Sequence, residues 1–336
     1  MRAGGEACRK RPRRVEAGPW RATSMSRVVA VTGATGFIGG ALARRLATAG
    51  WRIRVLVRPT SSRDRLGGVA AHLVVGDLGD LDSLRHFVYQ AEAVVHCAGT
   101  VRGASQAYFD RVNVEGVARL VQAAAGEHPA PRFLLISSLG AREPGLSAYA
   151  ASKRRGEEVL AAGGGKMPWT VLRPPAVYGP GDRELLPLFR WMARGIAPVL
   201  GSGNGRFSLL YVEDLAEAVV RWLSEGTAVQ RTFELDDGRP GGYTWTDVVD
   251  IMRSLRGRSV IPVRVPAFFL QVLAALNLAM ARVIGYKPML TPGKVRELRH
   301  ANWVCDSRAF MGATGWSPKI SLEEGLRRTL LGERSS

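Results

Sequence analysis

The chain has 336 residues, 46% of them hydrophobic and 23% charged, which suffices to bury the core of one large α/β domain or of two smaller lobes. Its three cysteines are far apart and lack metal-ligand spacing, so the sequence excludes a disulfide framework, predicts no metal site and favours the reducing cytoplasm. The formal net charge of +18 is dispersed over the chain, which argues against a nucleic-acid partner and leaves anionic substrates or lipid headgroups open.

Residues 1–24 are basic and show no apolar periodicity, with seven Lys or Arg against two acidic residues. They lack the apolar stretch that a signal peptide needs. We interpret them as a disordered basic tail or as sequence that precedes a true start at Met25. An interaction tail is the alternative interpretation.

A strand over residues 27–31, a glycine loop and a helix over residues 41–49 form the first predicted unit. Gly33 allows a tight turn, Gly36 lets the backbone approach a pyrophosphate, and Gly39 lets the helix pack closely on the strand. The positive end of the helix dipole then faces the phosphates. This order of elements predicts a dinucleotide-binding loop.

The second predicted strand, residues 52–57, is followed by Arg58. An acidic residue here would bind the adenosine ribose hydroxyls and favour NAD(H), whereas an arginine suits a 2′-phosphate. With Arg63 as a candidate helper, the sequence favours NADP(H) over NAD(H). A solvated surface arginine is the alternative. Further strands are expected over residues 72–75 and 93–95.

A fifth strand over residues 132–136 ends at Ser137 and Ser138, and a helix begins near Tyr149. Tyr149 and Lys153 are four residues apart and therefore share one face of that helix. We expect the ammonium group, helped by the positive nicotinamide ring of the cofactor, to lower the pKa of the phenol, which would make it a usable acid/base. Ser138, at the carboxyl end of a strand, is placed to hydrogen-bond the reacting oxygen, and Ser137 is assigned a structural role.

The glycine loop, Thr32-Gly33-Ala34-Thr35-Gly36-Phe37-Ile38-Gly39, and the Ser138, Tyr149 and Lys153 set resemble the extended short-chain dehydrogenase/reductases. This resemblance implies a doubly wound parallel sheet with a smaller C-terminal substrate lobe, a small-molecule substrate and a homodimer. It implies catalytic roles for Ser138, Tyr149 and Lys153, with Asn113 ordering the active site. The implied cofactor-binding residues are Gly33, Thr35, Gly36, Phe37, Ile38, Gly39, Arg58, Asp77, Leu78, Ala98, Gly99, Lys153 and Pro174. The implied substrate-binding residues are Tyr178 and Arg206.

On this basis we assign residues 25–180 to the cofactor-binding domain, with residues 208–235 returning to it, and residues 181–207 and 236–331 to the substrate lobe. Residues 266–284 are apolar almost all round. A helix buried between the lobes is the favoured interpretation. A helix that lies in a membrane interface, giving peripheral membrane contact, or that lines an apolar substrate pocket is the alternative.

The C-terminal segments resemble the 3-beta-hydroxysteroid dehydrogenase and dihydroflavonol reductase branches. Sugar-nucleotide epimerases match less well, because Ser138 and Tyr149 are only eleven positions apart here. We therefore expect hydride transfer to or from a hydroxyl or carbonyl carbon of a hydrophobic substrate. A nucleotide-sugar epimerase, dehydratase or reductase is one alternative. A non-catalytic NADP(H)-binding subunit, resembling the accessory subunit of respiratory complex I, is another.

Overall fold

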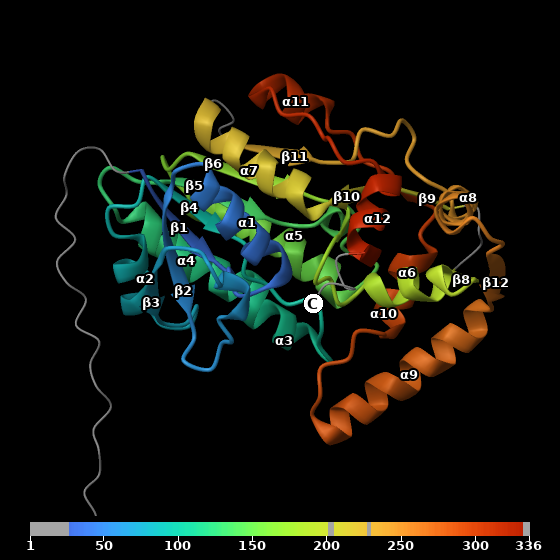
Figure 1. The fold of residues 1–336 in the computed structure, drawn as a ribbon. Coiled ribbons are helices and arrows are strands. Elements are labelled where there is room, and N and C mark those ends of the chain that lie inside the picture. Colours follow the sequence, from blue (N-terminus) through green and yellow to red (C-terminus); the bar gives the residue numbers. More distant parts are fainter. Residues whose placement is uncertain (1–26, 201–204, 227–229, 332–336) are drawn as a thin grey trace, which may run out of the picture.

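The structure is a computed structural model that describes residues 27–200, 205–226 and 230–331 (Figure 1). The interpretation of residues 1–24 therefore lies outside the described residues. Seven parallel strands form the central sheet in the spatial order β11-β6-β5-β4-β1-β2-β3. They are β1 (Val28–Thr32), β2 (Arg52–Val57), β3 (Ala71–Val75), β4 (Ala93–His96), β5 (Arg132–Ile136), β6 (Trp169–Arg173) and β11 (Arg231–Glu234).

The strands are buried on both faces, as the short apolar runs of the sequence predict for a parallel sheet. Alternate residues of one strand enter different cores: Val29 and Val31 of β1 pack on one side and Ala30 on the other. Helices α1 (Phe37–Thr48), α7 (Val212–Glu225) and α11 (Arg308–Thr314) cover the first face. Helices α2 (Leu81–Val88), α4 (Gly116–Ala125) and α5 (Ala148–Gly163) cover the second. This architecture confirms the predicted fold class.

A smaller lobe lies at one end of the sheet, around a core that includes Tyr178, Phe189 and Tyr211. Its helices are α6 (Leu186–Ala193), α8 (Trp245–Arg256), α9 (Ala267–Ile284), α10 (Pro292–Arg299) and α12 (Leu322–Leu331). Three two-stranded parallel pairs connect its segments: β7 (Ala176–Tyr178) with β10 (Leu209–Tyr211), β8 (Ile196–Leu200) with β12 (Ile261–Val265), and β9 (Arg206–Phe207) with β13 (Asn302–Trp303).

Short helical turns join several of these elements. They are the 3₁₀ turns η1 (Asp64–Leu66) and η3 (Leu139–Arg142), helix α3 (Gln106–Asp110), and the π-helical turn η2 (Arg111–Glu115) that leads into α4. Turn η2 holds Asn113, and Ser138 directly precedes η3, so both turns bear on residues that the sequence assigns to the active site.

The expectation that residues 266–284 form a helix buried between the lobes is wrong. They do form a helix, α9, but it lies on the outside of the small lobe with α10 between it and the sheet domain (Figure 1). Only Leu270, Ala274 and Ala281 of this helix are buried. Among the described residues it is the one helix long and apolar enough to cross a membrane, by length and composition alone.

Candidate functional site

A cleft of ≈ 2100 Å³ opens at the carboxyl ends of the parallel strands and extends to the small lobe. Doubly wound sheets bind ligands at this edge, where the strand order reverses between β1 and β4. The cleft is larger than the roughly 300–1,000 Å³ of a typical small-molecule pocket, so it has room for a large cofactor and a substrate. Its lining holds eleven Lys or Arg and six Asp or Glu, which favours an anionic ligand.

The glycine loop forms one wall of this cleft. Gly33 has a φ of +73°, which side chains rarely adopt, and a Cβ atom on Gly39 would lie 2.2 Å from the Gly33 carbonyl oxygen. Helix α1 begins at Phe37, earlier than predicted, and its N-cap residue Gly36 provides no side chain to cap the first turn. The free N–H groups of the first turn therefore remain for a ligand in the cleft. This geometry fits the pyrophosphate of a dinucleotide.

All the remaining residues predicted to bind the cofactor line the same cleft: Thr35, Phe37, Ile38, Arg58, Asp77, Leu78, Ala98, Gly99, Lys153 and Pro174. Arg58 is exposed at the end of β2, and its guanidinium forms no ion pair with any described residue. Arg63 is not part of the lining. Arg65 lines the cleft instead, and it donates a hydrogen bond to the Gly181 carbonyl oxygen at 2.8 Å.

The catalytic candidates meet in the centre of the cleft. The Ser147 hydroxyl caps α5 by accepting a hydrogen bond from the Ala150 N–H at 2.9 Å, and Tyr149 and Lys153 follow on one face of that helix. Lys153 Nζ donates to the Ile136 carbonyl oxygen at 2.9 Å. Ser138 is the N-cap residue of η3, and its Oγ accepts a hydrogen bond from the Gly140 N–H at 3.1 Å.

Burial dominates the electrostatics of this group. Burial raises the pKa of Tyr149 to about 12, a hydrogen bond with Ser138 opposes this rise, and the charge of Glu297 adds to it. The expected lowering of the Tyr149 pKa by Lys153 and a bound nicotinamide ring stays a prediction for the cofactor complex. Burial also lowers the pKa of Lys153 to about 8. At neutral pH the phenol carries its proton and most Lys153 side chains are charged.

Asn113 connects the cleft to the catalytic helix. Its Nδ2 donates to the Thr100 carbonyl oxygen at 3.0 Å and to Ser152 Oγ at 2.9 Å, and its Oδ1 accepts from the Thr100 N–H at 3.0 Å. Ser152 Oγ in turn donates to the Tyr149 carbonyl oxygen at 2.7 Å. Asn113 is therefore placed to hold α5 in position rather than to touch a substrate.

A buried network lies behind the catalytic face of α5. Ser137 Oγ donates to Glu157 Oε1 at 2.5 Å, and Arg173 forms a two-pronged pair with the same carboxylate, with Nη2 2.5 Å from Oε2. The hydroxyl of Ser137 is thus engaged away from the catalytic face, which fits the structural role assigned to it. The paired, hydrogen-bonded carboxylate joins the ends of β5 and β6 to α5.

Sequence reasoning missed two residues of α10. Lys294 Nζ lies 5.9 Å from the centre of the Tyr149 ring and pairs with Glu297 at 2.7 Å. Glu297 also accepts a short hydrogen bond from Ser147, the residue that caps α5. Ser147 and Glu297 are 150 positions apart, so no local pattern could have brought them together.

The two predicted substrate-binding residues have different surroundings. Tyr178 is fully buried in the small-lobe core, with its ring 5.5 Å from that of Tyr211, and it does not line the cleft. Its assignment to substrate binding is wrong, because β7 leaves the cleft after Ala176 and Val177 and ends with Tyr178 in the small-lobe core. Arg206 does line the cleft, where its Nε donates to the Gly241 carbonyl oxygen at 2.6 Å.

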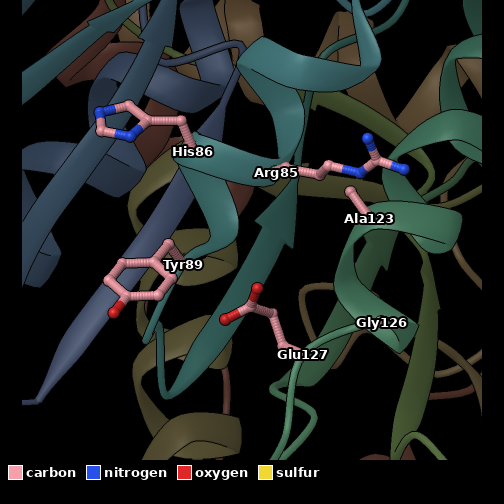
Figure 2. Close-up of a pocket in the computed structure, with 6 residues that line it drawn as sticks. All are labelled: Arg85, His86, Tyr89, Ala123, Gly126 and Glu127. Carbon is pink, nitrogen blue, oxygen red and sulfur yellow. The ribbon is translucent and has the colours of Figure 1, made fainter.

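A second hollow of ≈ 450 Å³ lies beside α2 and the end of α4, away from the catalytic group. Figure 2 shows the side chains of Arg85, His86, Tyr89 and Glu127 around it. None of the predicted site residues lines this hollow. The main cleft is therefore the candidate active site.

Comparisons with known proteins agree with this geometry. The chain is 38% identical to a ceramide reductase of Caulobacter vibrioides over 92% of this chain and 95% of that protein. It is 30% identical to mitochondrial NADH dehydrogenase [ubiquinone] 1 alpha subcomplex subunit 9 of Arabidopsis thaliana, over 68% of this chain and 58% of that protein.

It is also 30% identical to 3beta-hydroxysteroid-dehydrogenase/decarboxylase isoform 2 of the same plant, over 54% of this chain and 35% of that protein. These relatives support the branch to which the C-terminal segments point. Residues 29–235 match the family that contains the NAD-dependent epimerases and dehydratases. The glycine loop, the catalytic set and this match together show that the chain belongs to the NAD-dependent epimerase/dehydratase family.

Proposed function

We propose that this protein is a reductase that uses NADPH to convert the carbonyl group of a hydrophobic, lipid-like substrate into a hydroxyl group. The observation that carries the proposal is the meeting of Ser138, Tyr149 and Lys153 in the centre of a cleft whose glycine loop fits a dinucleotide. A carbonyl that accepts a hydride also needs a proton on its oxygen, and a phenol with a pKa of about 12 holds one at neutral pH.

Different residues of the chain would bind the cofactor, donate the proton and position the catalytic groups. The glycine loop, Arg58 and Lys153 would hold the cofactor, which supplies the hydride when it is bound. Tyr149 donates its proton to the substrate oxygen and is reprotonated from solvent. The Ser138 hydroxyl donates a hydrogen bond to the same oxygen and stabilises the charge that develops there. Asn113 and the pair of Glu157 with Arg173 hold these groups in place.

The preference for NADPH rests on Arg58. Its position after β2, its exposure and its lack of an ion pair among the described residues leave the guanidinium available for a 2′-phosphate. No acidic side chain follows β2 directly to accept ribose hydroxyls, because Pro59 and Thr60 come next.

The substrate class rests on the small-lobe side of the cleft. Apolar side chains line that side: Leu185, Leu188, Trp245, Met289 and Leu290. Long acyl chains or fused rings would bury apolar surface there, at roughly 25 cal/mol per Å². The similarity to a ceramide reductase over nearly the whole chain favours a ketone-bearing, ceramide-like lipid within this class.

The test is turnover followed by the absorbance of reduced nicotinamide, with three substrates: a ketone-bearing ceramide in detergent micelles, a steroid ketone and UDP-glucose. We expect oxidation of NADPH with the keto-lipid, faster than of NADH. Replacing Tyr149→Phe removes the proton donor and should lower kcat about 100-fold or more. The control Tyr178→Phe removes a hydroxyl buried outside the cleft and should leave turnover unchanged.

Conversion of UDP-glucose without net change in nicotinamide absorbance would replace the proposal with an epimerase. Tight binding of NADPH without turnover of any of the three substrates would favour the non-catalytic role. Full activity of the Tyr149→Phe variant would overturn the mechanism.

A further inference from the structure

The outer surface of α9 is strongly apolar and faces solvent. Six of its large apolar side chains are more than half exposed: Phe268, Phe269, Leu276, Met280, Val283 and Ile284. The exposed fraction reaches 76% for Phe268 at the first turn and 86% for Val283 at the last. We call this set of six the α9 face. Contiguous apolar surface of this kind marks a docking site in a folded protein.

The opposite side of α9 is fixed to the body of the small lobe. Leu270 and Ala274 pack against Val295 of α10, and Asn277 Nδ2 donates to the Leu290 carbonyl oxygen at 2.8 Å. The helix has 18 residues and is therefore about 27 Å long, shorter than the roughly 30 Å hydrocarbon core of a bilayer. A helix anchored along its length is suited to lie in a membrane interface rather than to cross it.

The charges around α9 identify its partner. Residues 251–300 contain nine Lys or Arg and one acidic residue; of these cations, Arg253 pairs with Asp250 and Lys294 with Glu297. Arg258, Arg264 and Arg282 are exposed and form no ion pair with any described residue. An anionic lipid surface would neutralise these cations while the α9 face enters the headgroup region. A second copy of the same face would set like charges against each other.

The segment after α9 leads directly to the active site. Lys287, Met289 and Leu290 line the cleft, and the Pro288 carbonyl oxygen accepts a hydrogen bond from the Gly103 N–H at 3.2 Å. Lys287 Nζ also lies 5.0 Å from the centre of the Tyr108 ring. The end of α9 and the rim of the cleft are therefore tied together on the same side of the molecule.

We propose that the α9 face docks the protein on an anionic lipid bilayer and that substrate passes from the bilayer into the cleft beside residues 285–291. The docking proposal depends only on the α9 face and on the exposed cations Arg258, Arg264 and Arg282. The passage of substrate rests in addition on the proposed function. An apolar substrate then enters the active site without crossing bulk water.

The experiment is flotation of the full chain with vesicles of phosphatidylcholine alone or with 30% phosphatidylglycerol. We expect binding to the anionic vesicles that weakens as salt rises. The double variant Phe268→Gln with Val283→Gln changes two solvent-facing side chains and should weaken binding about tenfold or more. The control Tyr89→Gln, 54% exposed beside α2, should bind like the parent chain.

Equal binding by the double variant would overturn the proposal. A dimer in vesicle-free solution that dissociates in the double variant would also overturn it, because the α9 face would then be a dimer interface. Turnover of a short-chain, water-soluble ketone separates the two proposals. If the protein turns over that ketone but does not bind vesicles, the docking proposal is wrong and the proposed function stands. If it binds vesicles but turns over no ketone, the docking proposal stands and the proposed function is wrong.

Discussion

Burial has opposite effects on the two titratable groups of the catalytic set. It raises the pKa of Tyr149 to about 12 and lowers that of Lys153 to about 8, because each shift favours the neutral form. Around neutral pH these shifts leave a proton on both groups. Tyr149 therefore carries the proton that reduction consumes, although its raised pKa makes it a weaker acid than an exposed phenol. Oxidation of an alcohol would need the phenolate, and the charge of Glu297 opposes its formation.

Arg58 offers the sharpest test of cofactor choice at a single residue. Replacing Arg58→Ala removes a charged donor from the ribose end of the cleft, and a hydrogen bond to a charged group contributes about 1.5–3 kcal/mol. We expect the Kd of NADPH to rise about tenfold or more while that of NADH changes little. Titration by nicotinamide fluorescence measures both constants.

The matched control is Arg63→Ala, an exposed arginine nearby that does not line the cleft. It should leave both constants unchanged. Equal weakening of the two cofactors by Arg58→Ala would show that Arg58 does not discriminate between them.

Helix α5, which bears Tyr149 and Lys153, packs closely against the π-helical turn η2. A Cβ atom built on Gly156 would lie 2.3 Å from the backbone carbonyl oxygen of Asn113 in η2. The absence of a side chain at this position thus lets α5 approach the π-helical turn whose Asn113 side chain holds Ser152. Packing of the helix and geometry of the active site depend on the same contact.

Gly156→Ala is therefore expected to destabilise the protein, although alanine is the better helix former by about 1 kcal/mol. The clash is with backbone, and overpacking of this kind costs about 1–3 kcal/mol. We expect a net fall in the free energy of unfolding, measured in urea, together with lower kcat. In α11, Gly312 has open space around its would-be Cβ, so Gly312→Ala should raise stability by roughly 0.5–1 kcal/mol. Similar effects of the two changes would disprove the packing argument.

The elements that the sequence predicted well are those in which a local pattern carries the signal. Buried runs predicted the strands, and the spacing of Tyr149 and Lys153 predicted their shared helix face. Helix α9 shows the limit of this approach. Its apolar composition fits a buried core or a membrane interface equally well, and only the tertiary structure shows which face is covered.

The same limit applies to single residues of the site. The family resemblance implies substrate binding by Tyr178, yet the structure buries this side chain in the small-lobe core. Lys294 and Glu297 reach Tyr149 and Ser147 from a helix much later in the chain, through contacts that no local spacing encodes.

At the scale of the whole molecule, the C-terminal chain joins the two lobes. Residues 302–331 begin with β13 in the small lobe, return to the sheet domain as α11, and end as α12 in the small lobe. Arg142 of η3 donates to the carbonyl oxygens of Asn302 and Val304 at 2.8 and 2.9 Å. Residues 302–331 therefore fix the two lobes relative to each other, although they contribute little to the lining of the cleft between them.

Asp214 of α7 attaches the C-terminal chain to the sheet domain through hydrogen bonds. Its buried carboxylate accepts hydrogen bonds from the N–H groups of Lys319 and Ile320 at 3.1 and 2.9 Å, and its carbonyl oxygen accepts one from Trp316 Nε1 at 3.1 Å. Asp214→Ala would leave two part-buried N–H groups without partners, at a cost of about 2–4 kcal/mol. Asp214→Asn keeps one acceptor oxygen and should lose less.

The neighbouring Glu213 is exposed and, among the described residues, pairs with Arg328 alone at 3.4 Å, so Glu213→Ala should change stability by about 1 kcal/mol or less. Urea unfolding of the three variants measures this order directly. Because Asp214 attaches the C-terminal chain to the sheet domain, hydrogen exchange in Asp214→Ala should increase over residues 302–331 before it increases in the central sheet. Uniform loss of protection would mean that these residues unfold only together with the whole molecule.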